Sequence, residues 1–597
     1  MREYSAPATF TVNADENLTD MVFANADRFG DAVSFRRQVD GSWVDVTARE
    51  FAAHVLAVAK GLIATGLKPG DRVALLSKTR YEWSLFDFAI WTAGCVTVPI
   101  YETSSADQVE WILTDSDARA VIVETPAHRA VVDGLVDRLP EIGRVWQIDA
   151  DEDLAPAVDE LTSLGAEVDD ETTHDLRRSV RASSLATLVY TSGTTGRPKG
   201  VELTHRNLLA EVRADLAAFP ELLRPNNSML VFLPLAHVFA RAIALCCVYA
   251  RTTVGHLPDV KTLVQDLGTF RPTFVVAVPR VFEKVYNSAR QQAHSTGKGR
   301  IFDLAESVAL EYSQTRRPGV ALRAKHLVFD RLVYVKLRAA LGGRCEAAIS
   351  GGAPLGERLA HFFRGIGVPV YEGYGLTETS AAIAVNTDAA FRVGTVGRPV
   401  AGASVRIDDD GEILLSGDMV FGSYWRNEVA TKESLQDGWF HTGDLGTVDS
   451  DGFIAITGRK KEIIVTAGGK NVAPAVLEDS LRMHPLVSQA LVVGDRRPFI
   501  GALITIDEEH FPHWKAAHGK PVSATVADLV DDPDLHATIQ SAVDSANQAV
   551  SRAESIRAFT VLPRDFSEER GEVTPSLKLR REVIAKAYAD RIESIYG

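Results

Sequence analysis

The chain has 597 residues, 46% of them hydrophobic, which is more than one hydrophobic core organises and predicts a multidomain enzyme. Its 64 Lys and Arg residues are outnumbered by 79 Asp and Glu residues, and the net charge of −15 argues against nucleic acid as a partner. The four cysteines, at positions 95, 246, 247 and 345, show neither a disulfide framework nor a metal-binding pattern. The N-terminal segment also lacks the apolar run of a secretory signal, so we expect a cytoplasmic protein with reduced thiols.

The most apolar long window, residues 229–250, is interrupted by Pro234, His237 and Arg241. A membrane-spanning helix needs about 20 predominantly apolar residues, so this window predicts a buried element. Any membrane contact is therefore expected to be peripheral. The sequence leaves a homodimer open as an assembly state.

From Asp71 onward, short apolar runs alternate with longer helical patterns, which predicts layered α/β structure. The first series of predicted elements is strand 73–76, helix 81–93, strand 96–100, helix 106–114 and strand 120–123. A second series has predicted strands at 228–233, 273–278 and 347–349. The charged, helical stretch 287–344 is expected to form surface helices beside the second sheet. We therefore predict two α/β subdomains with parallel sheets.

Residues 391–424 change to short extended runs separated by turns, which favours a β-rich subdomain. A domain boundary is expected near Gly458–Lys461. The elements predicted beyond it are strand 462–466, helix 474–483, and strands 487–493 and 500–506. The predicted division is a large domain at 1–459 and a small, mobile α+β domain at 460–597.

The segment LATLVYTSGTTGRPKG, residues 185–200, joins an apolar strand to a loop of hydroxyls and glycines. Glycines let the backbone approach an anion closely, and Lys199 supplies a point charge, so the loop suits a polyphosphate. It departs from the Walker pattern, because Gly200 rather than Ser or Thr follows the lysine and residues 201–203 look extended. Thr204 is a plausible cap for a later helix. A plain surface turn is the alternative.

Four further motifs follow in order: SGGAP at 350–354, YEGYGLTE at 371–378, GWFHTGD at 438–444 and GRKK at 458–461. The set resembles the adenylate-forming superfamily of acyl-CoA synthetases, luciferases and peptide-synthetase adenylation domains. The resemblance extends from about Phe51 to Arg581. The glycines near position 352 would allow a flat adenine to lie against the backbone, and Tyr374 would offer an aromatic face to the other side of the base.

The resemblance implies that ATP and Mg²⁺ bind these motifs, with Thr191 and Glu378 as oxygen ligands of the metal. Asp444 is expected to accept hydrogen bonds from the ribose hydroxyls, with Arg459 beside it as a charged donor. The residues assigned to the nucleotide are Ser192, Gly193, Thr194, Thr195, Gly196, Lys199, Gly352, Ala353, Gly373, Tyr374, Gly375, Thr377, Asp444 and Arg459.

The resemblance also assigns residues to the acyl group, the hinge and coenzyme A. Lys578, in TPSLKLRR, is expected to neutralise charge at the α-phosphate, although many relatives have glycine before this lysine. Lys461 is the expected hinge, and Gly468 and Gly469 are expected to pass the pantetheine arm. His237 borders the acyl pocket in this interpretation, whereas the sequence alone favours a core histidine.

The activity implied is conversion of a carboxylic acid to acyl-AMP with release of pyrophosphate, then transfer of the acyl group to coenzyme A. The helical insert and the segments TAGGKNVAP and TPSLKLRR are most similar to bacterial long-chain fatty acyl-CoA synthetases, so the expected substrate is a long-chain fatty acid. Medium-chain and aromatic acids are the alternative substrates. The alternatives are an acyl-AMP ligase that loads a carrier protein and a non-catalytic nucleotide- or lipid-binding protein on the same fold.

Overall fold

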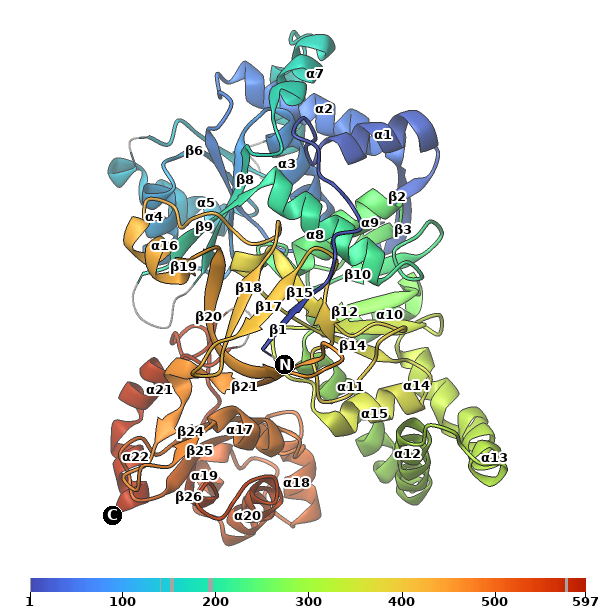
Figure 1. Cartoon of the computed structure of the whole chain (residues 1–597), viewed down its shortest axis with the longest axis vertical. Helices are drawn as coiled ribbons and strands as arrows, with labels where there is room; N and C mark the ends of the chain where they lie inside the picture. Colours follow the sequence, from blue (N-terminus) through green and yellow to red (C-terminus); the bar gives the residue numbers. More distant parts are fainter. Residues whose placement is uncertain (1, 140, 151–154, 192–196, 575–577) are drawn as a thin grey trace. The chain divides into compact units, whose positions relative to one another are not determined.

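The computed structural model describes residues 2–139, 141–150, 155–191, 197–574 and 578–597 (Figure 1). The chain forms two compact units. Unit 1 comprises Met1–Arg406, Leu414–Thr442 and Val448–Ile454, and unit 2 comprises Ile407–Ile413, Gly443–Thr447 and Ala455–Gly597. Both mix helices and strands, which confirms the predicted α/β class with a large N-terminal and a small C-terminal part.

The first sheet of unit 1 has the strand order β7-β6-β4-β5-β8-β9. All neighbours are parallel except β9, which runs antiparallel to β8. The strand β5 is buried along its whole length, as expected for a strand covered on both faces. The strands are β4 (Arg72–Leu76), β5 (Val96–Ile100), β6 (Ala118–Val123), β7 (Arg144–Gln147), β8 (Leu185–Thr191) and β9 (Lys199–Thr204).

The second sheet has the order β16-β15-β14-β13-β12-β10-β11-β2-β3. The strands from β14 to β2 are parallel, and antiparallel strands flank them on both sides. Both predicted parallel sheets are therefore present. The strands are β2 (Val33–Val39), β3 (Ser42–Thr47), β10 (Ser228–Val231), β11 (Thr253–His256), β12 (Phe274–Ala277), β13 (Ala347–Ser350), β14 (Val370–Leu376), β15 (Ala381–Val385) and β16 (Arg398–Pro399).

Helices pack on these two sheets. Those of the N-terminal part are α1 (Asp20–Phe29), α2 (Ala48–Ala64), α3 (Tyr81–Thr92), α4 (Ala106–Asp115), α5 (Pro126–Asp133), α6 (Ala157–Leu164) and α7 (Asp170–Ser179). Those that follow are α8 (His205–Ala218), α9 (Val238–Ala250), α10 (Leu263–Phe270), α11 (Pro279–Ser295), α12 (Gly299–Gln314), α13 (Val320–Phe329), α14 (Val335–Ala340), α15 (Glu357–Gly365) and α16 (Glu428–Ser434). The stretch predicted to be helical, 287–344, contains α12 to α14.

A buried ion pair joins the two layered halves of unit 1. Arg241 of α9 donates to both carboxylate oxygens of Asp87 of α3, at 2.5 and 2.8 Å, and also to the hydroxyl of Thr187 of β8. Both ionic side chains are 3% exposed. Because α3 packs on the first sheet and α9 on the second, the pair connects the helices between the sheets. The arginine that interrupted the apolar window is thus a core residue.

The predicted β-rich part is a third sheet with the order β1-β17-β18-β20-β19, in which β21 pairs with β20. Its strands are β1 (Glu3–Ser5), β17 (Ser404–Ile407), β18 (Glu412–Ser416), β19 (Leu435–Gln436), β20 (Trp439–Val448) and β21 (Ile454–Arg459).

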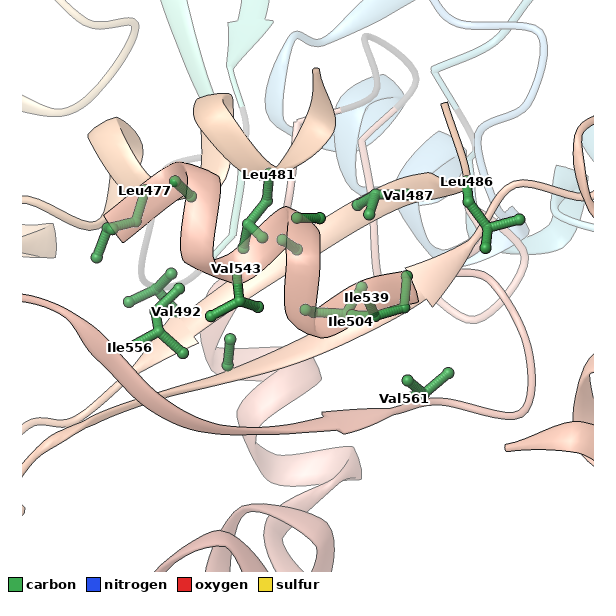
Figure 2. Close-up of a cluster of buried hydrophobic side chains, with 14 of the residues drawn as sticks. Leu477, Leu481, Leu486, Val487, Val492, Ile504, Ile539, Val543, Ile556 and Val561 are labelled. Carbon is green, nitrogen blue, oxygen red and sulfur yellow. The ribbon is translucent and has the colours of Figure 1, made fainter. Parts of the chain in front are cut away.

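Unit 2 has its own core, built on the sheet β24-β25-β26. Apolar side chains of α17, α20 and the sheet interdigitate there, among them Leu477, Val543 and Ile504 (Figure 2). The predicted strand 462–466 is wrong in extent, because the 3₁₀ turn Lys460–Glu462 precedes a two-residue strand that forms a hairpin. The elements are β22 (Ile464–Val465), β23 (Asn471–Val472), α17 (Pro474–Arg482), β24 (Val487–Val493), β25 (Ile500–Ile506), α18 (Phe511–Ala517), α19 (Val526–Leu529), α20 (Pro533–Asn547), β26 (Ile556–Val561), α21 (Arg581–Ala587) and α22 (Ala589–Tyr596).

Two expectations from the sequence concern the state of the cysteines and the presence of membrane-spanning helices. All four cysteines are buried and unbridged, as predicted. Among the helices in the described ranges, none has both the length and the apolar character that crossing a bilayer requires.

Candidate functional site

The glycine-rich segment joins β8 to β9, and Thr191 and Lys199 are paired across this antiparallel hairpin. The predicted nucleotide residues Ser192, Gly193, Thr194, Thr195 and Gly196 lie outside the described residues. Lys199 opens β9, so the sequence after it is extended, as predicted. Thr204 caps α8, accepting a hydrogen bond from the backbone N–H of Asn207, which confirms its predicted role.

A second segment, residues 423–425, is bonded along β9. The backbone N–H of Trp425 donates to the carbonyl of Gly200 at 2.7 Å, and that of Glu202 donates to the carbonyl of Ser423 at 3.1 Å. A β-bridge pairs Val201 with Tyr424 between them. Tyr424 is therefore held beside the end of the glycine-rich hairpin, although 223 positions separate it from Val201 in sequence.

Tyr424 brings two predicted site residues together. Its hydroxyl donates to Oε1 of Glu378 at 2.7 Å, and the ammonium of Lys199 lies 5.3 Å from the centre of its ring. Burial and the neighbouring Glu378 carboxylate raise the pKa of the Tyr424 hydroxyl, so it stays protonated and donates. Thr191, Lys199 and Glu378 are thus connected through one hairpin and one aromatic ring.

The motif SGGAP begins at the last residue of β13, and YEGYGLTE forms the neighbouring parallel strand β14 beyond its first residue and enters the turn that follows. Ser350 is paired with Glu372 in the register, so Gly352 and Gly373 follow at the same edge of the sheet. In open α/β sheets this edge is where ligands bind. Ala353 is exposed there, Thr377 begins the 3₁₀ turn that carries Glu378, and Tyr374 is buried, leaving little of its ring accessible.

Two of the glycines at this edge are required by the backbone. Gly352 has φ of +85°, in the left-handed region that favours glycine. A Cβ on Gly375 would lie 1.4 Å from the carbonyl oxygen of Ala381 in β15, so no other residue fits. Because Gly375 lies at the bulge between β14 and β15, the bulge and its glycine fix the turn that presents Glu378.

His237 is the N-cap of α9, and its Nδ1 accepts a hydrogen bond from the N–H of Phe239 at 3.2 Å. Its side chain is half-buried, which is intermediate between the two interpretations of the sequence, a core histidine and a residue at the acyl pocket. A Cβ on Gly351 would come within 3.3 Å of the Phe239 ring, so the start of α9 lies against the SGGAP turn. The predicted role of His237 at the acyl pocket stays a prediction.

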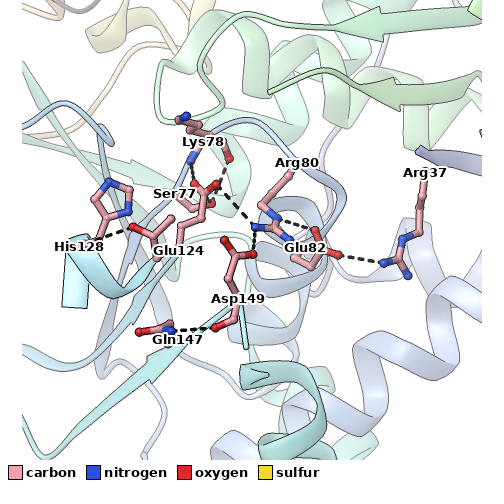
Figure 3. Close-up of polar contacts among 10 residues, drawn as sticks. Arg37, Ser77, Lys78, Arg80, Glu82, Glu124, His128, Gln147 and Asp149 are labelled. Carbon is pink, nitrogen blue, oxygen red and sulfur yellow. Dashed lines mark hydrogen bonds and ion pairs between the residues drawn. The ribbon is translucent and has the colours of Figure 1, made fainter. Parts of the chain in front are cut away.

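The loop before His237 is anchored to the first sheet. The hydroxyl of Thr79, just beyond β4, donates to the carbonyl of Leu233 at 2.7 Å and accepts from the N–H of Leu235 at 3.2 Å. A set of polar side chains lies at the carboxyl ends of β4, β6 and β7 (Figure 3). The residues drawn include Ser77, Lys78, Arg80, Glu82, Glu124 and Asp149.

The arginine and carboxylate charges in this set are partnered by one another. Arg80 donates at 2.7 Å to both Glu82 and Asp149, and Glu124 accepts from the N–H of Lys78 at 2.6 Å. Glu82 also pairs with Arg37 of β2 at 3.0 Å, which ties the second sheet to this edge. Because these interactions satisfy the charges, the network serves to position the loops at the site.

In unit 2, Asp444 and Arg459 are brought together as expected. Arg459 donates from Nε to Oδ1 of Asp444 at 2.7 Å, and the Asp444 side chain is 6% exposed against 42% for Arg459. The N–H of the adjacent Gly443 donates to Glu412, which also pairs with Lys460 at 3.2 Å. A buried carboxylate beside a half-exposed guanidinium suits a sugar diol.

Three of the remaining predicted residues of unit 2, Lys461, Gly468 and Gly469, lie on turns. Lys461 is exposed within the 3₁₀ turn Lys460–Glu462. Gly468 and Gly469 form the tip of the hairpin between β22 and β23, where Gly469 has φ of +75° and open space around it. Lys578 is exposed, and its N–H donates to the hydroxyl of Thr574 at 3.0 Å.

The two predicted metal ligands, Thr191 and Glu378, both offer side-chain oxygens. Over the described ranges, no group of three or more His, Cys, Asp or Glu side chains is arranged to hold a metal ion. Magnesium usually keeps waters and phosphate oxygens and takes only one or two protein oxygens. The Glu378 carboxylate and the Thr191 hydroxyl are donors of this type.

Sequence reasoning missed Tyr424. It stands in the segment GSYWRN, which belongs to none of the five motifs, and an isolated tyrosine carries no local signal. Its extended neighbours and the preceding glycine predicted only a β-rich region. The contact of Tyr424 with Glu378 depends on the pairing of residues 423–425 with β9, which the sequence does not show.

Family comparisons agree with this architecture. Residues 22–425 match the AMP-binding enzyme family, and residues 461–597 match the AMP-binding enzyme C-terminal domain. The chain therefore belongs to the AMP-binding enzyme family, and the resemblance to the adenylate-forming superfamily is confirmed.

Its relatives include enzymes named as long-chain-fatty-acid–CoA ligases. FadD15 of Mycobacterium bovis is 56% identical and that of Mycobacterium tuberculosis 55% identical, each over 601 residues and 100% of both chains. ACSBG1 of Homo sapiens is 31% identical, covering 96% of this chain and 84% of its own.

Solved structures share the fold. The anthranilate CoA ligase AuaEII, in complex with anthranoyl-AMP, has a TM-score of 0.73 at 20% identity and covers 98% of this chain and 99% of its own. The o-succinylbenzoate coenzyme A synthetase MenE from Bacillus subtilis, in complex with ATP and magnesium ion, has a TM-score of 0.67 at 22% identity, covering 94% and 98%.

Proposed function

We propose that this protein is an ATP-dependent long-chain fatty acid–CoA ligase that forms AMP. The observation that carries the proposal is the 56% identity, over the entire chain, to a relative named for that activity. The convergence of Lys199, Tyr424 and Glu378 beside the glycine-rich hairpin supports it, because a polyphosphate needs cations and magnesium ligands in one place. The substrates are a fatty acid, ATP and coenzyme A.

A carboxylate acylates poorly because its leaving group would be oxide, so it is first activated. A carboxylate oxygen of the fatty acid attacks the α-phosphorus of ATP, the bond to the bridging oxygen breaks, and pyrophosphate leaves. The thiol sulfur of coenzyme A then attacks the acyl carbon, AMP leaves with the carboxyl oxygen, and the thiol proton goes to solvent. The products are acyl-CoA and AMP.

In the first step, we assign Lys199 and the loop after Thr191 to the polyphosphate. Magnesium, when bound by Thr191 and Glu378, supplies charge neutralisation at the phosphates. Tyr424 orients the Glu378 carboxylate, which would bind the metal, by donating to its Oε1. Asp444 accepts from the ribose hydroxyls, and Lys578 offsets the charge that develops at the α-phosphate.

In the second step, the thiol needs access to the acyl carbon. We propose that residues 460–597 form a mobile domain that rotates about Lys461 between the two steps. The exposed position of Lys461 in a short 3₁₀ turn supports this role. The hairpin tip at Gly468 and Gly469 offers backbone without side chains to the pantetheine arm.

An acid panel assayed for AMP release with and without free coenzyme A tests the function. Palmitate is expected to give palmitoyl-CoA, AMP and pyrophosphate in equal amounts. Accumulation of acyl-AMP without thioester would instead identify an acyl-AMP ligase that loads a carrier protein. No fatty-acid-dependent pyrophosphate release would identify a non-catalytic binding protein and refute the proposal.

We also propose that the enzyme contacts membranes peripherally. A long-chain fatty acid partitions into lipid bilayers, so an enzyme that uses it gains substrate by lying on the bilayer surface.

A further inference from the structure

The helical segment from α13 to α14 presents apolar side chains to solvent. Val320 is 85% exposed, and the exposed fractions of Leu327, Val328, Leu332 and Val335 are 58%, 55%, 54% and 47%. We call these five residues, with the cations around them, the insert face. Large aliphatic side chains exposed to this degree on one short segment indicate an interaction surface.

The exposed residues lie on one side of the segment. Spacings of three, four and seven residues, as between Val320 and Leu327 or Val328 and Leu332, place side chains on one helical face. The opposite side is anchored in the protein, since Leu322 and Leu337 are buried. The Tyr334 hydroxyl also donates to the carbonyl of Ala305 in α12 at 2.7 Å. The apolar face therefore points away from α12 because the helix is fixed in that orientation.

Exposed cations accompany this apolar strip: Arg316, Arg317, Arg323, Lys325, Arg331 and Lys336. Asp330 is the only acidic residue between Arg316 and Arg344, and it pairs with Arg338 at 2.7 Å. A chain with a net charge of −15 thus carries a local excess of positive charge on one segment. This segment is therefore net positive, whereas the whole chain is net negative.

An apolar strip beside Lys and Arg is the pattern of a helix that lies in the interface of an anionic bilayer. Aliphatic side chains enter the headgroup boundary, and the cations remain at the phosphates. A second copy of this acidic chain is a poorer occupant, because the insert face offers no acidic strip to pair with its own cations. We propose that the insert face docks this protein on the surface of anionic lipid membranes.

This proposal rests on the proposed function, because it assigns a surface to the peripheral membrane contact proposed there. Vesicle binding can nevertheless be measured without a fatty acid substrate. The full-length protein is mixed with vesicles of phosphatidylcholine alone or with phosphatidylglycerol, and the bound fraction is measured by sedimentation. We expect binding to the anionic vesicles that weakens at high salt. Equal binding to both vesicle types, or none to either, would overturn the proposal.

Two variants locate the surface. Arg323→Glu/Lys325→Glu/Lys336→Glu and Leu327→Ser/Val328→Ser/Leu332→Ser are each expected to lower the affinity for anionic vesicles about tenfold or more. The matched controls change exposed residues elsewhere: Arg552→Glu/Arg557→Glu/Lys586→Glu and Val429→Ser/Val522→Ser. The controls are expected to bind like the native protein. Equal losses in variants and controls would refute the insert face as the docking site.

Folding, activity and self-association are measured on the same variants. The thermal midpoint and the rate of palmitoyl-CoA formation from detergent-dispersed palmitate are expected to stay at native values. For the native protein, normal ligase activity without vesicle binding refutes the docking surface alone, whereas vesicle binding without ligase activity refutes the proposed function alone. Light scattering that shows a dimer lost only in the serine variant, with no vesicle binding, would assign the face to a second copy.

Discussion

The hydroxyl of Tyr424 donates a 2.7 Å hydrogen bond to Oε1 of Glu378, although 46 positions separate them in sequence. The backbone of Glu378 is fixed from the same region, because its carbonyl accepts from the N–H of Phe421 at 2.7 Å. Residues 421–424 therefore hold both the main chain and the carboxylate of the proposed magnesium ligand. Removing the hydroxyl frees the carboxylate but leaves the backbone bond in place.

Tyr424→Phe keeps the ring beside Lys199 and removes only this hydrogen bond. Because hydrogen bonds to charged groups contribute about 1.5–3 kcal/mol, we expect kcat/KM for MgATP to fall at least tenfold, with a higher magnesium requirement. Steady-state rates titrated with Mg²⁺ measure both. Tyr334→Phe is the matched control, since it also loses a 2.7 Å hydrogen bond. A native magnesium requirement in Tyr424→Phe would show that the tyrosine does not orient Glu378.

Asp444→Asn tests the ribose assignment. The change removes the charge that Arg459 pairs with and replaces one acceptor oxygen with a donor, so one ribose hydroxyl loses its partner. We expect KM for ATP to rise about tenfold with a smaller change in kcat. Asp449→Asn, which disturbs an ion pair with Arg392, controls for loss of an ionic contact. If both variants raise KM for ATP equally, Asp444 has no special role with the nucleotide.

Lys578→Ala separates the two half reactions. Fatty-acid-dependent exchange of pyrophosphate into ATP is expected to fall about a hundredfold or more, because charge at the α-phosphate is no longer offset. Conversion of supplied palmitoyl-AMP to palmitoyl-CoA is expected to continue at a near-native rate. Lys586→Ala, another exposed lysine of unit 2, is the control. An equal loss in both half reactions would place Lys578 outside adenylation.

Asp215 in α8 gives a prediction for stability against pH. Its carboxyl group is fully buried, and this burial raises its pKa from 3.8 to about 7, although a contact from the Cys246 thiol opposes the rise. Glu211, one turn earlier, is also buried, and burial together with Asp215 raises its pKa. The folded protein therefore holds protons that the unfolded chain releases, so the free energy of unfolding falls as the pH rises from about 4 to about 7.

Asp215→Asn is neutral at every pH and is expected to flatten this dependence. At pH 8 it should stabilise the protein by a few kcal/mol relative to the native chain, from about 1.4 kcal/mol per unit of pKa. Urea denaturation followed by tryptophan fluorescence measures it, since Trp83 and Trp91 are buried in unit 1. Asp159→Asn, at an exposed helix position, is the control. A native slope between pH 4 and 7 in Asp215→Asn would contradict the prediction.

Local patterns in the sequence determined several elements to the residue. The bounds of β5, β24 and β25 agree with the predicted strands, because each is a short segment rich in the β-branched residues Val and Ile. The Thr204 cap followed from one hydroxyl before a helical pattern. The nucleotide motifs were identifiable because backbone approach to a phosphate or a base requires glycine at fixed positions, as at Gly352.

Burial and long-range pairing were decided only by the tertiary structure. Glu211 and Asp215 are charged residues on a helix, and a sequence cannot show that α8 buries them. The insert helices were predicted as charged surface helices, yet their fixed orientation turns an apolar strip outward. Tyr424 reaches Glu378 because strand pairing with β9 sets its position. Local patterns reflect local backbone energetics, whereas these contacts depend on which distant segments the packed sheets bring together.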